Sequence, residues 1–299
     1  MVVRPLVDSD LPQLLRLLEL QDVHAEFRTM APESRNVHEL ALELGDESPY
    51  NDMLPLVVEQ NGHLTAYLAV CNYNGEAFLE GPVLAEGVTQ QAVSTLFETA
   101  IEAARSRGYA FVEAFVNEQN EVAQQVLEQA GFEAFRTTYM YEIRRADKRP
   151  PVPKTTAFRF AVGADIDVST YRDLYRETSD NWANRLAWTD EELETRFNDP
   201  DVTMILAYDG DKLVGHLEIE MLTAEGYAEV AYFGVLPEAR GRGLGRALIL
   251  HGIEEAFRDD DIELVLARAH DDERAACFAL EKLGFKLSHG VVSFTLELA

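Results

Sequence analysis

Two hydrophobic periodicities alternate along this 299-residue chain and predict a mixed α/β protein. Apolar residues three and four apart predict helices, at 88–105, 121–129, 169–177, 188–197, 248–257 and 272–282. Short runs with strand character fall between them, at 54–60, 64–70, 76–84, 109–116, 203–208, 213–221, 229–236 and 262–269. Turn residues Asn61-Gly62 and Asp209-Gly210 separate two pairs of these strands, which predicts two hairpins.

The order of the predicted elements occurs twice at one constant offset. Phe132 and Phe285 are 285 − 132 = 153 residues apart, and the pairs Gly81/Gly234 and Glu76/Glu229 have the same separation. A gapless internal repeat indicates a duplicated domain. Residues 147–156 are polar and rich in proline, as expected of a linker. We therefore predict domains at 1–146 and 157–299.

A glycine-rich turn follows the strand 229–236 and leads into a helix. It consists of Arg240, Gly241, Arg242, Gly243, Leu244, Gly245 and Arg246. Glycines let the backbone approach an anion, and the N–H groups at a helix N-terminus attract it. The three arginines stand out in a chain with a formal net charge of −27. We predict a phosphate site that is neither a P-loop, since no Lys-Ser/Thr follows, nor a dinucleotide fingerprint, whose glycine spacing is wider.

The pattern Arg240-x-x-Gly243-x-Gly245, after a strand and Pro237, resembles the acyl-CoA pyrophosphate loop of the GNAT N-acetyltransferase superfamily. The element order of both halves is similar to the GNAT fold, in the tandem arrangement of mycothiol-synthase-type members. The resemblance implies two tandem GNAT folds. It also implies that an acetyl group moves from acetyl-CoA, the co-substrate, directly to a primary amine of an unidentified acceptor.

The first half departs from this loop chemistry. At the offset of 153, Gly87 replaces Arg240, and Gln90, Ala92 and Val93 replace Gly243, Gly245 and Arg246, respectively. The glycines and cations that would hold pyrophosphate are therefore lost. We predict one acetyl-CoA per chain, in the catalytic C-terminal half, and a degenerate first half.

The resemblance also implies where pantetheine lies. It would extend beside Phe233, Gly234 and Val235 like an added strand. A backbone N–H near Gly234 and Val235 would face the thioester oxygen as that oxygen gains charge. Gly234 is suited to a β-bulge there, and the alternative is a plain kink in the strand.

Glu229 is the first catalytic candidate. It precedes Arg240 by 240 − 229 = 11 residues, the spacing of the catalytic glutamate in histone-acetylating GNAT members. The resemblance implies a general base, and burial among apolar residues would raise the pKa of the carboxyl as that role requires. The alternative is an exposed strand glutamate that pairs with a cation.

Further candidates lie on neighbouring strands. His216, Glu218 and Glu220 alternate along one strand, so they share a face and form either an acceptor wall or a base. His270 follows the strand 262–269 and is another candidate. A histidine in such a position is often structural.

The sequence departs from the family at the tyrosine that protonates the leaving thiolate, because Leu280 stands in its place. Either the acid is dispensable, because a thiol leaves readily as a thiolate, or Tyr232 or Tyr227, which are within reach along the strand, replaces it. The segment before the second hairpin holds both tryptophans, Trp182 and Trp188. Aromatic side chains suit a cationic amine, and the alternative is that they pack a helical pair.

Composition excludes several functional classes. The chain is 47% hydrophobic but has no run of about 18 apolar residues, so we expect no membrane span. Its N-terminus lacks the apolar stretch of a signal peptide, which predicts a cytoplasmic protein. A pI of about 4.5 argues against binding to nucleic acid. We predict no metal site, and the oligomeric state stays open.

The sequence is also compatible with two other functions. One is a mycothiol-synthase-like acetyltransferase acting on an amino sugar thiol. The other is a non-catalytic acyl-CoA-binding sensor or interaction protein, which the missing tyrosine acid at Leu280 permits.

Overall fold

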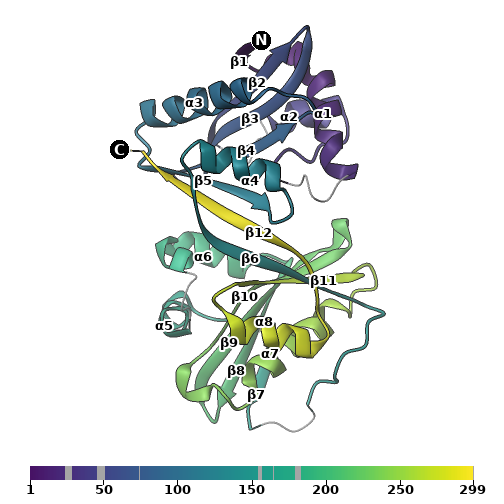
Figure 1. Ribbon diagram of the computed structural model, residues 1–299. Coiled ribbons are helices and arrows are strands. Elements are labelled where there is room, and N and C mark those ends of the chain that lie inside the picture. Colours follow the sequence, from purple (N-terminus) through teal and green to yellow (C-terminus); the bar gives the residue numbers. More distant parts are fainter. Residues whose placement is uncertain are drawn as a thin grey trace. The chain divides into compact units, whose positions relative to one another are not determined.

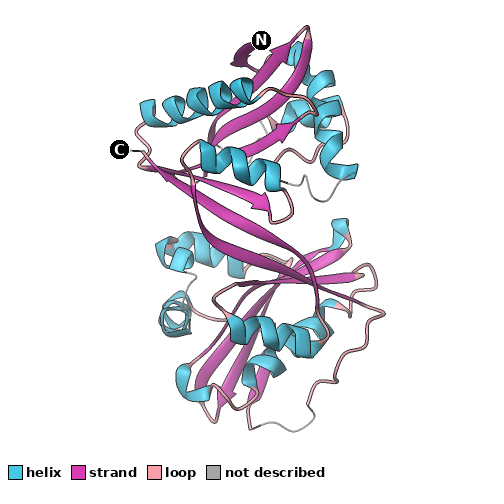
Figure 2. Cartoon of the chain, in the orientation of Figure 1, coloured by secondary structure: helices cyan, strands magenta, loops and turns pink. Residues whose placement is uncertain are grey.

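A computed structural model describes the chain except residues 24–28, 46–50, 74, 154–156, 164, 179–182 and 299. The chain forms two compact units. Unit 1 contains residues 1–138 and 289–299, and unit 2 contains residues 139–288. Each unit has a β-sheet with helices on both faces (Figures 1 and 2), which confirms the predicted mixed α/β class.

Unit 1 has the strand order β1-β2-β3-β4-β5-β12. The strands are β1 (Val2–Pro5), β2 (Asn51–Gln60), β3 (His63–Tyr73), β4 (Glu76–Leu84), β5 (Phe111–Asn117) and the end of β12 (Lys286–Glu297). Its helices are α1 (Leu11–Val23), α2 (Val37–Glu43), α3 (Gln90–Ser106) and α4 (Glu121–Gln129). One core packs α1 and α2 against the sheet, and a second core packs α3 and α4.

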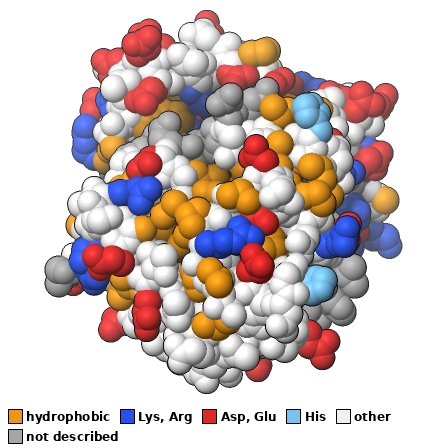
Figure 3. Space-filling view, turned by 90° about the horizontal axis from the view of Figure 1, so that it is seen from above, with side chains coloured by type: hydrophobic (Ala, Val, Ile, Leu, Met, Phe, Trp, Pro, Cys, Tyr) orange, Lys and Arg blue, Asp and Glu red, His pale blue; other side chains and the backbone are white. Residues whose placement is uncertain are grey.

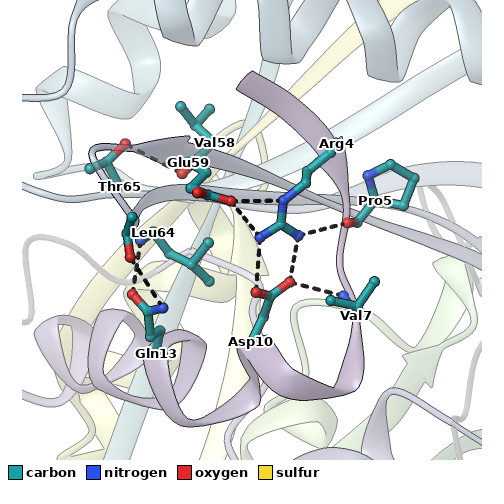
Figure 4. Close-up of polar contacts among 10 residues, drawn as sticks. Arg4, Pro5, Val7, Asp10, Gln13, Val58, Glu59, Leu64 and Thr65 are labelled. Atoms are coloured by element: carbon teal, nitrogen blue, oxygen red, sulfur yellow. Dashed lines mark hydrogen bonds and ion pairs between the residues drawn. The ribbon is translucent and has the colours of Figure 1, made fainter. Parts of the chain in front are cut away.

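Arg4 forms ion pairs with two carboxylates at the edge of the unit 1 sheet (Figure 4). Its Nη1 lies 2.6 Å from Asp10 Oδ2, and its Nη2 lies 2.8 Å from Glu59 Oε2 on β2. Asp10 also accepts a hydrogen bond from the Val7 backbone N–H at 3.0 Å. The hydrogen bonds from Arg4 hold the pKa of Asp10 below its usual range. These contacts hold together β1, β2 and the short 3₁₀ turn (Asp8–Asp10) that precedes α1.

Unit 2 has the strand order β6-β11-β10-β9-β8-β7. The strands are β6 (Glu133–Arg144), β7 (Arg159–Val162), β8 (Val202–Asp209), β9 (Lys212–Leu222), β10 (Tyr227–Val235) and β11 (Leu264–His270). Its helices are α5 (Val168–Thr178), η3 (Ala183–Ala187), α6 (Asp190–Phe197), α7 (Leu244–Ala256) and α8 (Arg274–Leu283). A large core packs α7 and α8 on one face, and a smaller aromatic core packs α5 and α6 on the other.

Both predicted hairpins are present, and the turn of the second one differs from the prediction by one residue. Asn61 and Gly62 have φ of 52° and 79°, as a type I′ turn requires. In the second hairpin Asp209 pairs with Lys212, so the turn residues are Gly210 and Asp211, one residue later than predicted. Gly210 has φ 61°, which fits the first position of a type II′ turn.

The boundaries between the compact units fall inside β6 and β12. These strands are related by the repeat, because 133 + 153 = 286 and 144 + 153 = 297. Residues 291–297 of β12 pair antiparallel with β5, so the C-terminal strand completes the sheet of unit 1. β6 stands next to β11 in the sheet order of unit 2. The predicted division at 1–146 and 157–299 follows the repeat and stays a prediction, while contacts divide the chain differently.

Acidic side chains are spread around the face shown in Figure 3 rather than gathered in one patch. Lysine and arginine side chains lie among them, although the formal net charge is −27. Within the described ranges, every helix is too short or too polar to cross a bilayer.

Candidate active site

The glycine-rich turn lies between β10 and α7, as the sequence predicts. A short 3₁₀ turn (Pro237–Ala239) leaves the strand, and α7 begins at Leu244 directly after Gly243. Gly241 and Gly243 have φ of 72° and 81°, a region that side chains strongly disfavour. The backbone path of this turn therefore requires glycine at both positions.

The space beside these glycines is open. A Cβ built on Gly241 or Gly243 would meet no atom within 4 Å. Gly243 is the N-cap of α7 and supplies no side chain to bond the first N–H groups of the helix. Those groups lack partners inside the helix and carry its positive dipole end. The turn is thus a suitable site for the pyrophosphate of a coenzyme A thioester.

The three arginines of the turn have different surroundings. Arg240 Nε donates to the Val235 carbonyl at 3.0 Å and braces the turn against the end of β10. Arg242 Nη1 lies 2.5 Å from Asp209 Oδ2, and its guanidinium stacks 4.5 Å from the Phe158 ring. Arg246 is exposed and has no ion-pair partner in the part of the chain that the structure describes. Arg246 is therefore the cation of the three with the fewest competing contacts.

β10 and β11 separate beyond the middle of the sheet. They pair in parallel only where Tyr227–Glu229 meets Leu264–Leu266, although β10 continues to Val235 and β11 to His270. The gap lies beside Phe233, Gly234 and Val235, the residues predicted to adjoin pantetheine. The predicted bulge at Gly234 is wrong, since the register shift lies between Val230 and Tyr232.

Gly234 has a different role, which is close packing. It pairs with His216 on β9, and a Cβ at Gly234 would lie 3.0 Å from His216 Cε1 and overlap the Thr178 side chain. Glycine is therefore required here so that α5 and β9 can approach the β10 backbone.

The corresponding gap in unit 1 is filled by the chain itself. β4 and β5 pair only where residues 77–79 meet 112–114. Beyond this, Met30 bridges the two strands. Its N–H donates to the Phe115 carbonyl at 3.3 Å, and its carbonyl accepts from the Gly81 N–H at 2.5 Å. Thr29 forms an antiparallel bridge with Val116. Backbone from residues 29–30 thus lies where an added strand would otherwise pair.

The helix start in unit 1 also differs from that in unit 2. Thr89 is the N-cap of α3, and its hydroxyl accepts from the Ala92 N–H at 3.3 Å. Gln90, at the place of Gly243, bonds to Gln129 at 2.7 Å. A side chain therefore satisfies one of the N–H groups that remain open in unit 2.

Glu229 lies on the same sheet face as α5 and α6, and it forms an ion pair. Its Oε1 contacts Arg268 of β11, and the two side chains are 20% and 38% exposed. The carboxylate is thus partly buried, as the general-base interpretation expects, and paired with a cation, as the alternative expects, so its role as a base stays a prediction.

Glu218 and His216 are buried on the same face. Glu218 is 0% exposed, and its Oε1 accepts from Arg185 Nη2 at 2.7 Å and from Arg196 Nε at 2.8 Å. Arg196 also contacts Glu220 at 2.6 Å. Neither arginine was among the residues predicted for the site. Their signal was the alternating acids of β9, because buried carboxylates require cationic partners.

His216 is 1% exposed and neutral at physiological pH. Burial, and secondly the nearby Arg185 cation, lower the pKa of His216 to about 4. A neutral imidazole offers one hydrogen-bond donor and one acceptor.

The remaining predicted residues are distributed as follows. The Arg185 guanidinium lies between the rings of Trp188 and Tyr232, 4.2 Å from each. Trp182 lies outside the described residues. Leu280 is 1% exposed and belongs to the core under α7 and α8. The place of the family's tyrosine is thus a core position here.

Unit 1 contains a buried acid whose titration is testable. Glu80 is 2% exposed, and Tyr67 donates to it at 2.5 Å. Burial raises the pKa of Glu80 from 4.5 to about 7. The folded state therefore holds a proton that the unfolded state loses, so stability falls as pH rises from about 4.5 to about 7, by roughly 3 kcal/mol.

Glu80→Gln keeps the acceptor for Tyr67 and removes the titration. We expect the variant to be more stable than wild type at pH 8 and similar to it at pH 4.5, measured by denaturant unfolding at both pH values. An equal difference in free energy of unfolding at the two pH values would contradict the assignment.

Comparison with known proteins agrees with this geometry. The sequence profile of the acetyltransferase (GNAT) family matches residues 20–132 and 169–285, one segment in each half of the chain. The chain belongs to the acetyltransferase (GNAT) family. It is accordingly an acyltransferase, built as a tandem of two GNAT folds.

One named relative and two solved structures are similar to this chain over most of its length. Mycothiol acetyltransferase from Mycobacteroides abscessus is 27% identical over 245 residues, covering 78% of this chain and 81% of the relative. A tandem GNAT protein from the clavulanic acid biosynthesis pathway has a TM-score of 0.66 at 18% identity, covering 100% and 98% of the two chains. A GCN5-related N-acetyltransferase from Sphaerobacter thermophilus has a TM-score of 0.75 at 18% identity, covering 99% and 95%. The structural matches show the fold alone.

Proposed function

We propose that the protein transfers an acetyl group from acetyl-CoA to a primary amine at a single site in unit 2. The observation that carries this proposal is the open turn at Gly241 and Gly243, which leads into the uncapped N-terminus of α7 beside the gap between β10 and β11. Pyrophosphate would bind the turn, with Arg240 and Arg246 nearby. Pantetheine would follow Phe233–Val235 toward the acceptor face.

One acetyl-CoA per chain is part of the proposal. Two features of unit 1 support it: Thr89 caps α3, and residues 29–30 bridge the gap between β4 and β5. An acyl-CoA molecule entering unit 1 would have to displace the hydrogen bonds of Met30. At the start of the helix it would then find one glycine, Gly87, and no arginine. Each feature alone weakens binding there.

In the proposed reaction the amine nitrogen attacks the thioester carbon, the C–N bond forms and the C–S bond breaks. Glu229 removes the surplus proton from nitrogen. Since Arg268 contacts Oε1, the proton would go to Oε2, directly or through water. Tyr232, beside the bulge, is the proposed donor to the leaving sulfur. His216 and Glu218 support the acceptor.

A second candidate is transfer to an amino sugar thiol, as in mycothiol formation. The relative from Mycobacteroides abscessus named mycothiol acetyltransferase, which aligns over 78% of this chain, favours it. The two proteins would then act on the same class of acceptor.

Release of free coenzyme A tests the proposal. The purified chain would be incubated with acetyl-CoA and a panel of amines, amino acids, polyamines, peptides and amino sugar thiols, and products identified by mass spectrometry. We expect an N-acetylated product and stoichiometric free thiol with at least one class. Tight coenzyme A binding without turnover on any acceptor would instead support the non-catalytic acyl-CoA sensor.

A further inference from the structure

We propose that His216 and Tyr171, with Glu218, form a subsite for a hydroxyl group, so that the acceptor is a hydroxylated primary amine. This inference rests on the proposed acetyl transfer in unit 2 and adds the chemical class of the acceptor.

The subsite consists of buried polar atoms that lack hydrogen bonds. In the part of the chain that the structure describes, neither ring nitrogen of His216, nor the Tyr171 hydroxyl, nor Glu218 Oε2 has a partner. The three residues are 1%, 1% and 0% exposed. Buried polar groups are nearly always satisfied, and each exception is unfavourable for the folded state. Several such atoms, on β9 and on the helix α5 that packs against it, point to a polar ligand that would supply their missing hydrogen bonds.

These atoms lie next to the proposed acyl-transfer position. His216 Cε1, which is bonded to both ring nitrogens, lies 3.0 Å from where a Cβ of Gly234 would be. Gly234 belongs to the stretch of β10 that borders the gap toward β11. The Tyr171 ring stands edge-on to His216, with ring centroids 5.5 Å apart. A group bound here would therefore belong to the molecule that meets the thioester.

The hydrogen-bond donors and acceptors of the subsite match a hydroxyl group best. Neutral His216 and the Tyr171 hydroxyl each offer one donor and at least one acceptor, while Glu218 Oε2 only accepts. A hydroxyl both donates and accepts. An ammonium group only donates, so it would leave the donors of His216 and Tyr171 unsatisfied. A carboxylate only accepts, so it would leave the acceptors unsatisfied and face Glu218.

Charge leads to the same choice. Glu218 is already neutralised by Arg185 and Arg196. A second cation placed here would face Arg185, whose positive charge already acts on His216. The rings of Tyr171 and Phe197 add apolar walls. An uncharged polar group is the ligand that this environment accommodates best.

The test compares ethanolamine with 2-methoxyethylamine, a primary amine of similar size and basicity that lacks the hydroxyl proton. Coenzyme A release is measured over a range of each amine at saturating acetyl-CoA. We expect kcat/KM to be at least about tenfold higher for ethanolamine, because the ether cannot donate to the buried acceptors.

Tyr171→Phe is the informative variant, and Tyr175→Phe is its matched control one helical turn along α5. Tyr171→Phe removes a hydroxyl that is unsatisfied without ligand, so Tm should be unchanged or raised. The ethanolamine preference should fall several-fold with no change in acetyl-CoA affinity. Tyr175→Phe should keep the preference.

A preference that Tyr171→Phe reduces supports the subsite. Equal kcat/KM for the two amines, or a loss of Tm without a change in preference, would overturn it while leaving acetyl transfer intact. Absence of turnover with every amine would overturn the proposed function and this inference with it.

Discussion

Gly243→Val is expected to weaken acetyl-CoA binding about a hundredfold or more. Gly243 has φ 81°, and the space beside it is open toward the first N–H groups of α7. Valine is strained at positive φ, and its side chain would cover those donors. Each charge-assisted hydrogen bond lost to phosphate is worth about 1.5–3 kcal/mol, and about 1.4 kcal/mol is a factor of ten in affinity.

Gly87→Val is the control for this prediction. Gly87 has φ 80°, also meets open space, and precedes α3 in unit 1 as the glycine turn precedes α7 in unit 2. It imposes similar backbone strain and should leave acetyl-CoA affinity unchanged. Titration calorimetry should give one site per chain for wild type and Gly87→Val. A second site that persists in Gly243→Val would show that unit 1 binds the cofactor.

Glu229→Gln is expected to lower kcat by about 10²–10⁴, the usual contribution of a general base, with acetyl-CoA affinity retained. The amide cannot take a proton from the attacking amine. The loss should shrink at high pH, where the amine is already neutral. Turnover and acetyl-CoA affinity would be measured from pH 6.5 to 9.5.

Glu76→Gln supplies the matched control, since Glu76 stands at the same place in the repeat, on β4 of unit 1. It should turn over like wild type. If Glu229→Gln kept the wild-type kcat/KM at neutral pH, proton removal would have to be assigned to His216, Glu218 or water.

Local sequence was sufficient for much of the proposed cofactor site. Gly241 and Gly243 allow a path that other residues disfavour, and a helix start offers anion-binding N–H groups wherever it occurs. Thr189 and Glu192 likewise form a capping box at the start of α6. These features depend on residues close together in the chain, so the amino-acid pattern specifies them directly.

Contacts between segments far apart in the chain could not be predicted from the sequence in the same way. β6 and β12 are repeat-related strands, and a period-2 pattern does not state which sheet each one completes. Insertion of residues 29–30 beside Gly81 and Phe115 uses backbone hydrogen bonds, which carry no side-chain signature. The bulge lies at Val230–Tyr232, where packing across three strands sets the register, and Gly234 instead makes room for Thr178.

The sequence by itself determined the duplicated α/β architecture, the glycine turn and the half of the chain that carries it, because periodicity and backbone conformation are local properties. The tertiary structure decided the surroundings of the polar residues. Arg268 pairs with Glu229, and Arg185 and Arg196 neutralise Glu218. It also left the polar side-chain atoms of His216 and Tyr171 buried without hydrogen-bond partners in the described part of the chain. Burial and charge pairing depend on residues brought together by folding, and these set what each group can bind.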